Sequence, residues 1–305
     1  MPNYGLTDKS MVLESAFGGW ALARRPFAEP GAEPHYAPSR SCEVVLYDLR
    51  LRIDPVAGTL AGEARLSLAF HAGPATEVAL DLDEVEVEGV STPEGEAVPF
   101  AHGDGKLRFP RQAEVVIRWH GRPRRGLYFV GPSAAEPARD HQAWTQCQDE
   151  DAHFIFPCID HPSVKHPWRI RVEAPPGFVV VSNGRFDGEA WVVDSPMPAY
   201  LFTAGVARLD RHRDRAGDVP VDYYVPAGTD ARVVRRAFHK TPAMVQFLSG
   251  LYGAYPWPRY DQVVVHDFIF GGMENLAATT LDDTVLVDDA AALDSDLDSL
   301  VVHEL

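Results

Sequence analysis

The strongest restriction on the fold is a long region in which apolar and polar residues alternate. An apolar residue stands at every second position in four successive segments: Leu49, Leu51, Ile53; Ala64, Leu66, Leu68, Phe70; Val78, Leu80, Leu82; and Val85, Val87. A period of two puts one face of a strand in a core and the other in water, which is typical of antiparallel sheets. Turn sequences such as Asp54-Pro55 and Pro93-Glu94-Gly95 separate the segments. This region therefore predicts an antiparallel β-sandwich.

The strand pattern continues through most of the first two thirds of the chain. Five further segments are predicted as strands: 113–119, 170–173, 178–182, 190–193 and 201–207. For most of these residues the packing of a sandwich is a sufficient explanation, and no chemistry is needed.

The length, net charge and cysteine content of the chain limit the functions that it can have. A chain of 305 residues with 46% hydrophobic residues is long enough for two domains. The formal net charge of −16 argues against a nucleic-acid or anionic-membrane partner, because phosphates are bound by clustered Lys and Arg. Cys42, Cys147 and Cys158 are odd in number and lack CxxC spacing, so we expect no disulfide framework and a reducing compartment. Without a membrane span or signal-peptide pattern, a cytoplasmic location is expected.

The composition changes near Leu209, where we place a domain boundary. A charged run, 208–215, is expected to be exposed, and a strand is predicted around 221–225. Asp230 is expected to cap a helix, and Pro242 is expected either to kink this helix or to start a second helix with Thr241 as its cap. A strand over 262–265 follows. We expect an N-terminal extension over 1–38, an all-β domain over 39–209, and the first part of a second domain over 210–305.

The last residues predict an amphipathic helix. Asp294 or Ser295 is expected to cap it, with Asp296 and Asp298 in the first turn. Its apolar face consists of Leu297, Leu300, Val301 and Leu305. His303 and Glu304 form the first half of HExxH, in which two His one turn apart bind zinc and the Glu acts as general base. The alternative is a solvated helix end.

A glycine-rich segment, Gly271-Gly272-Met273-Glu274-Asn275, lies about 30 residues before this pair. Glycines let a substrate backbone approach closely and leave their N–H groups unobstructed. A carboxylate at Glu274 can pair with a free ammonium group and so select a peptide N-terminus. The alternative is a turn that carries a surface Glu.

A third segment is unusual within the β region. Gln146 and Gln148 alternate, which predicts two amides on one face of an extended segment, where they can hold a peptide backbone or an amine. The alternative is a strand edge with solvated side chains. The segment Phe156-Pro157-Cys158-Ile159-Asp160-His161-Pro162-Ser163-Val164-Lys165 follows, and then Ser182-Asn183-Gly184.

Together these motifs resemble the zinc aminopeptidases of the aminopeptidase N and leukotriene hydrolase type. The resemblance covers the chain from about Ser39 and implies a β-sandwich domain followed by a thermolysin-like catalytic domain. It also implies one zinc ion bound by His303, with Glu304 as general base. By the same resemblance, substrate contacts fall to Gln146, Gln148, Gly271, Gly272, Met273 and Glu274.

Three features depart from the common pattern of that family. The position of Gln148 is usually Glu in aminopeptidases and Gln in hydrolase-like members, and Gly272 stands where many members carry Ala. The Arg pair common before Phe156-Pro157-Cys158 is missing, with His153-Phe154 near its place. These departures bear on substrate preference.

The resemblance implies the N-terminal part of a zinc aminopeptidase whose partners are peptides with a free N-terminus and the C-terminal remainder of the catalytic domain. Alternatives are a leukotriene-hydrolase-like enzyme that also acts on epoxides, and a noncatalytic peptide-binding or scaffold module. The second His of the motif would fall beyond Leu305. Because catalytic zinc needs about three protein ligands, the chain alone is expected to bind zinc weakly and to be inactive.

Overall fold

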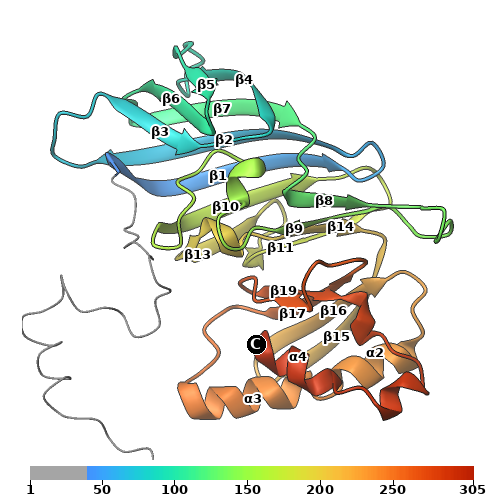
Figure 1. Ribbon diagram of the computed structural model, residues 1–305. Helices are drawn as coiled ribbons and strands as arrows, with labels where there is room; N and C mark the ends of the chain where they lie inside the picture. The colour runs from blue at the N-terminus through green and yellow to red at the C-terminus, as the bar shows by residue number, and fades with distance from the viewer. Residues whose placement is uncertain (1–39) are drawn as a thin grey trace, which may run out of the picture. The chain divides into compact units, whose positions relative to one another are not determined.

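The computed structural model describes residues 40–305, so the predicted extension 1–38 lies outside the described residues. Within residues 40–305, strands form most of the chain up to Ala207, and helices appear only after it, apart from short 3-10 turns (Figure 1). Among residues 40–305, no helix has both the length and the apolar character needed to cross a bilayer.

The largest sheet contains the segments that alternate most clearly. Its seven strands lie in the order β12 (Arg185–Phe186), β13 (Trp191–Pro198), β10 (Lys165–Glu173), β1 (Cys42–Asp54), β2 (Thr59–Phe70), β7 (Glu114–Gly121) and β4 (Val85–Ser91). Leu49, Leu51 and Ile53 of β1 are fully buried, as the alternation predicts. One pairing differs from the antiparallel expectation, because β1 runs parallel to β10. These strands lie far apart in the chain, and local alternation cannot reveal such a pairing.

Two smaller sheets complete the β region. One contains β3 (Glu77–Asp81), β6 (Lys106–Pro110) and β5 (Ala101–Gly103). The other contains β11 (Val179–Ser182), β14 (Ala204–Ala207), β9 (Gln142–Gln146) and β8 (Gly126–Val130). A continuous apolar core joins the seven-stranded sheet to its neighbours, with Trp119, Trp168 and Phe109 among its largest buried side chains.

The final hundred residues build a separate mixed sheet with helices on one side. The strand order is β15 (Leu209–Ala216), β16 (Val219–Pro226), β17 (Tyr260–Val265), β19 (Ala278–Asp282) and β18 (Gly272–Met273). The helices are α2 (Ala231–Phe238), α3 (Thr241–Tyr252) and α4 (Leu297–His303). Four 3-10 turns are also present in the described chain: η1 (Ala152–Phe154), η2 (Ala199–Leu201), η3 (Asp283–Val285) and η4 (Ala291–Leu293).

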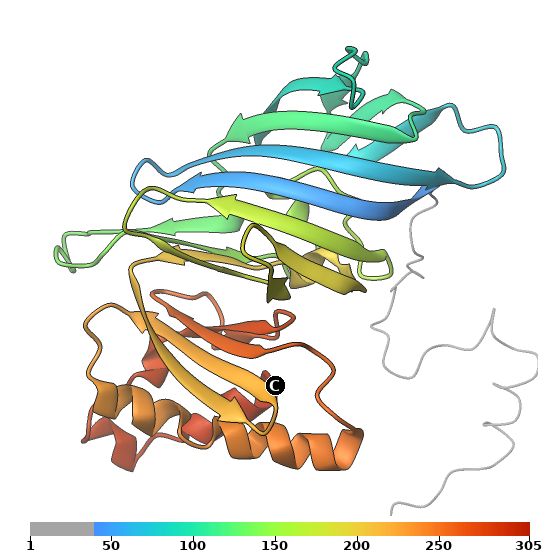
Figure 2. The same ribbon diagram turned by 180° about the vertical axis from the view of Figure 1, so that it is seen from behind.

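The four-stranded sheet lies directly against the mixed sheet, and the helices cover the opposite face of the mixed sheet (Figures 1 and 2). The contact is close at β14 and β17, where a Cβ placed on Gly205 would lie 3.2 Å from Val263 Cγ1. The glycine therefore lets the two layers approach.

The charged run 208–215 is mostly exposed, as expected, and almost all of it lies on the edge strand β15, which pairs along its length with β16. Edge strands carry such charges because one side is open to water. The prediction of a cap at Thr241 is wrong, because the cap position is Lys240 and the Thr241 hydroxyl donates to Gln262 Oε1 instead.

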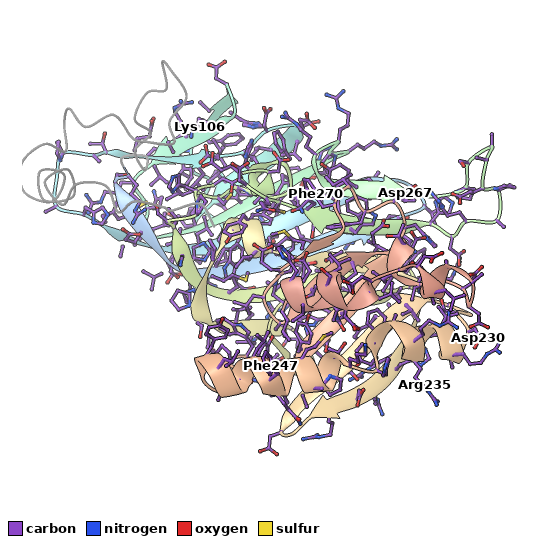
Figure 3. All side chains as sticks on the ribbon, turned by 60° about the horizontal axis from the view of Figure 1, so that its bottom comes forward. Lys106, Asp230, Arg235, Phe247, Asp267 and Phe270 are labelled. Atoms are coloured by element: carbon purple, nitrogen blue, oxygen red, sulfur yellow. The ribbon has the colours of Figure 1, made fainter. Side chains whose placement is uncertain are left out.

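The predicted caps at Asp294 or Ser295 are also wrong. Asp296 caps α4 and accepts a hydrogen bond from Ser299 N at 3.2 Å. The cap of α2 is confirmed, since Asp230, labelled in Figure 3, accepts from Arg232 N at 2.8 Å. Several neighbouring Asp and Ser residues offer equivalent caps in sequence, and packing of the helix decides between them.

Candidate active site

The glycine-rich segment forms a short edge strand with one buried anchor. In β18, Gly272 and Met273 pair antiparallel with Leu281 and Thr280 of β19. The Met273 side chain is fully buried in a cluster with Trp144 and Val263. Because side chains alternate along a strand, burying Met273 turns Glu274 to the exposed side.

Helix α4 packs across these glycines. A Cβ added to Gly272 would lie 2.6 Å from both Cγ and Oε1 of Glu304, and one added to Gly271 would lie 3.2 Å from Leu300 Cδ1. The glycines therefore leave the space that the last turn of α4 occupies. Two motifs separated by β19, η3 and η4 are thus brought into contact, and Glu304 rests on the strand that leads into Glu274.

Burial and a neighbouring charge act on Glu304. The residue is only 8% exposed, whereas the preceding His303 is exposed. Burial raises the pKa of Glu304, the His303 ring opposes the rise, and the Glu274 carboxylate adds to it. A buried carboxyl group with a raised pKa is a better proton acceptor than a solvated one, which suits a general base.

Asn275 ties the strand to the β region, a role that the sequence alone did not assign. Its Nδ2 donates to the carbonyl oxygens of Leu201 at 3.2 Å and Phe202 at 3.3 Å. Its Oδ1 accepts from Thr280 Oγ1 at 3.0 Å. The sequence did contain a clue, because Asn275 stands in a mostly apolar segment beside Glu274. An amide buried in such a segment needs hydrogen-bond partners.

The glutamine segment differs from its predicted geometry. Strand β9 ends at Gln146, which is 1% exposed, and Gln148 lies exposed in the following turn. The two amides therefore do not share one face of an extended segment. Instead Gln148 N donates to Gln146 Oε1 at 2.9 Å, because the chain turns directly after the strand.

The end of β9 nevertheless lies beside the strand of Glu274. Thr145 Oγ1 donates to the Phe202 carbonyl at 3.4 Å, the same oxygen that Asn275 contacts at 3.3 Å. One backbone carbonyl thus connects a neighbour of Gln146 with a neighbour of Glu274.

His153, which lies near the place of the missing Arg pair, binds a carboxylate. Both the backbone N and the Nδ1 of His153 lie 2.9 Å from Asp160 Oδ2. Burial disfavours protonation of His153, but the Asp160 carboxylate outweighs it, so the pKa of His153 is raised.

The residues present do not complete a metal site. Within residues 40–305, no three His, Cys, Asp or Glu side chains are grouped so as to hold a metal ion. His303, the candidate ligand, is exposed, and a catalytic zinc site uses about three protein ligands. The donor set of this chain alone does not fit the ion, and we derive no reaction step through it.

Comparison with known families gives the identity of the chain. Residues 44–201 match the peptidase M1 N-terminal domain, and residues 236–305 match the peptidase family M1 domain. The chain belongs to peptidase family M1. The family resemblance is thereby confirmed, as is an M1 fold with a mostly β N-terminal domain and the start of a catalytic domain.

Similar curated proteins come from distant organisms. This M1 chain is 28% identical to probable aminopeptidase 2 of Sulfurisphaera tokodaii over 75% of its length and 31% of that protein. It is 27% identical to aminopeptidase M1 of Arabidopsis thaliana over 85% of its length and 33% of the relative. Leukotriene A-4 hydrolase of Xenopus laevis is 27% identical over 53% of the chain and 27% of that enzyme. The chain thus spans about a third of the first two relatives.

The same architecture occurs in solved structures. A structure of yeast LTA4 hydrolase in complex with bestatin matches with a TM-score of 0.73 and 20% identity, covering 90% of this chain and 46% of that one. At this identity the likeness shows the fold.

Proposed function

We propose that this M1 chain is the N-terminal part of a zinc-dependent aminopeptidase that removes residues from peptide N-termini. The observation that carries the proposal is the packing of Glu304 on Gly272, which puts the candidate base beside the strand of Glu274. The two carboxylates differ in exposure, since Glu304 is buried and Glu274 is open to solvent. This difference suits Glu304 to proton transfer and Glu274 to binding a substrate.

Each residue has a proposed role. The Glu274 carboxylate binds the substrate ammonium and excludes peptides whose N-terminus is blocked. Glu304 accepts a proton from the attacking water, a task favoured by its raised pKa. Gly271, Gly272 and Met273 present backbone to the substrate, and Gln146 and Gln148 contribute substrate contacts from the end of β9.

A zinc ion is part of the proposal through His303. When bound, zinc polarises a carbonyl and lowers the pKa of water. His303 is assigned as one ligand, and no cluster of three His, Cys, Asp or Glu side chains completes the site within residues 40–305. The proposed partners are peptides with a free N-terminus and the remainder of the catalytic domain.

We also propose the domain division near Leu209, with an all-β domain over 39–209 and the start of the catalytic domain over 210–305. A cytoplasmic location is proposed from the three cysteines, all buried and free.

The test is Glu304→Gln in the full-length protein. The amide keeps the shape that packs on Gly272 but cannot accept the proton, so turnover of an aminoacyl anilide should fall about 10²–10⁴-fold. Bound zinc, measured by metal analysis, should be unchanged because His303 is untouched. An active Glu304→Gln enzyme, or a wild-type protein that does not cleave free N-termini, contradicts the proposal.

A further inference from the structure

Glu274 stands at the start of a tight loop that joins β18 to β19. Asn275 N donates to Met273 O at 2.8 Å, and Ala278 N donates to Asn275 O at 3.0 Å. Ala277 adopts a left-handed conformation with φ +66°, which few non-glycine residues do. Such a loop keeps its shape only where neighbouring groups hold it.

The holding group comes from the β region, from Asn183 directly after β11. Asn183 is fully buried, and its Nδ2 donates to Leu276 O at 3.0 Å and to Leu201 O at 2.9 Å. Its Oδ1 accepts from Thr203 N at 2.7 Å. Its two amide hydrogens and its oxygen are therefore all engaged, and one of these bonds reaches the loop of Glu274.

Two asparagines from different domains meet at one oxygen. The Leu201 carbonyl accepts from Asn183 at 2.9 Å and from Asn275 at 3.2 Å. Because one residue belongs to the β region and the other follows Glu274, this shared acceptor fixes the loop against the β region.

The turn that carries Asn183 is itself held from the catalytic side. Arg259 Nε donates to Gly184 O at 2.6 Å, its guanidinium also donates to Ser182 O, and it pairs with the buried Asp261. On the other side of the turn, a Cβ at Gly184 would lie 2.2 Å from Val192 O. The turn therefore has little freedom to move.

We propose that Asn183 is a positioning residue for Glu274, with Arg259 holding Asn183 in place. This inference rests on the proposed role of Glu274 in binding the substrate ammonium. Asn183 contacts only the Leu276 carbonyl of the loop, so it acts through the backbone. The structure thus assigns a residue of the non-catalytic domain to amine recognition.

The experiment is hydrogen–deuterium exchange on Asn183→Ala. Loss of the bond to Leu276 O frees the loop, so the amides of Asn275 and Ala278 should exchange about tenfold faster. Unchanged exchange at both amides, in a variant that still folds, overturns the inference.

Tyr47→Phe is the matched control. It removes another buried side-chain bond to a carbonyl, that of Pro157, and should leave exchange at Asn275 and Ala278 unchanged. Equal acceleration in both variants would mean a general loss of stability and would overturn the inference. If Asn183→Ala does not fold, Arg259→Lys serves instead. Lys keeps the positive charge opposite Asp261, but it lacks the guanidinium that binds the Gly184 and Ser182 carbonyls together. Hydrogen exchange at Asn275 and Ala278 should therefore become faster, though less so than in Asn183→Ala.

Activity separates the inference from the function on which it rests. In the full-length protein, Asn183→Ala should lower the preference for free over N-acetylated substrates about tenfold, while Tyr47→Phe keeps the wild-type preference. A wild-type enzyme without that preference refutes the role of Glu274, whatever the exchange shows. A wild-type preference that Asn183→Ala retains refutes the positioning role alone.

Discussion

Two regions of the molecule meet at Phe202 and are built in opposite ways. The Phe202 ring belongs to an aromatic cluster with Phe156 at 5.0 Å and Trp168 at 6.3 Å between ring centroids. Its carbonyl oxygen belongs to the polar junction, defined here as Thr145, Asn183, Asn275 and Arg259 with the carbonyls that they bind. The first region is held by contact between apolar surfaces and the second by directed hydrogen bonds.

The difference separates stability from position. Apolar packing makes a large contribution to the free energy of folding but depends little on orientation. A hydrogen bond from a side chain to a carbonyl contributes only about 1 kcal/mol, but it fixes the position of a backbone segment. Changes in the aromatic cluster should therefore alter the free energy of unfolding. Changes near the junction should alter the placement of Glu274 or Glu304 more than the stability.

The largest effect concerns His166, which is buried in the aromatic cluster. Its ring stacks on Tyr47 with the centroids 5.4 Å apart and packs at a tilt against Trp168 at 4.4 Å, and burial lowers the pKa of His166 to about 4. Below its ordinary pKa of about 6.5, the unfolded chain binds a proton that the native state does not. The free energy of unfolding should therefore fall by about 3 kcal/mol as the pH drops from 6.5 to 4.

Denaturant titrations at several pH values measure this loss. His166→Leu replaces the titrating ring with an apolar side chain of similar size. The loss of unfolding free energy between pH 6.5 and 4 that comes from His166 should therefore disappear. Parallel losses in wild type and His166→Leu between pH 6.5 and 4 would show that His166 is not the group responsible.

A smaller effect is expected at Gly272. Gly272→Ala adds a Cβ 2.6 Å from Glu304 Cγ, so the Glu304 side chain must leave its rotamer at a cost of roughly 0.5–1.5 kcal/mol. The specificity constant of the full-length enzyme should fall about two- to tenfold, with little change in the melting temperature.

The neighbouring glycine provides the control. At Gly271 the added Cβ would lie 3.2 Å from Leu300 Cδ1, far from the Glu304 carboxylate, so Gly271→Ala should leave the specificity constant nearly unchanged. Equal losses at both positions would mean that α4 as a whole moves and that the Gly272–Glu304 contact has no special weight.

The sequence predicted what depends on local pattern. Alternation at Leu49, Leu51 and Ile53 gives a strand with one buried face because the side-chain period of a strand is two. Asp230 was identified as a cap because it stands directly before the helical pattern and its carboxylate can accept from the first free N–H groups of the helix. The family was identified because glycine-rich and His-Glu motifs at this spacing are specific.

What the sequence missed depends on contacts across long separations. The parallel pairing of β1 with β10 and the bond from Asn183 to Leu276 O join segments that no local pattern relates. The turn after Gln146 was missed because alternation of two glutamines looks the same whether or not the strand ends between them.

The central claim is that Glu274 recognises the substrate ammonium, and one ratio tests it most directly. The measurement compares the specificity constants for a peptide with a free N-terminus and for its N-acetylated form, in wild type and in Glu274→Ala of the full-length protein. A charge-assisted hydrogen bond contributes about 1.5–3 kcal/mol, so the free peptide should lose about ten- to a hundredfold and the acetylated one almost nothing. Equal losses for both peptides would contradict the claim and make Glu274 a structural residue.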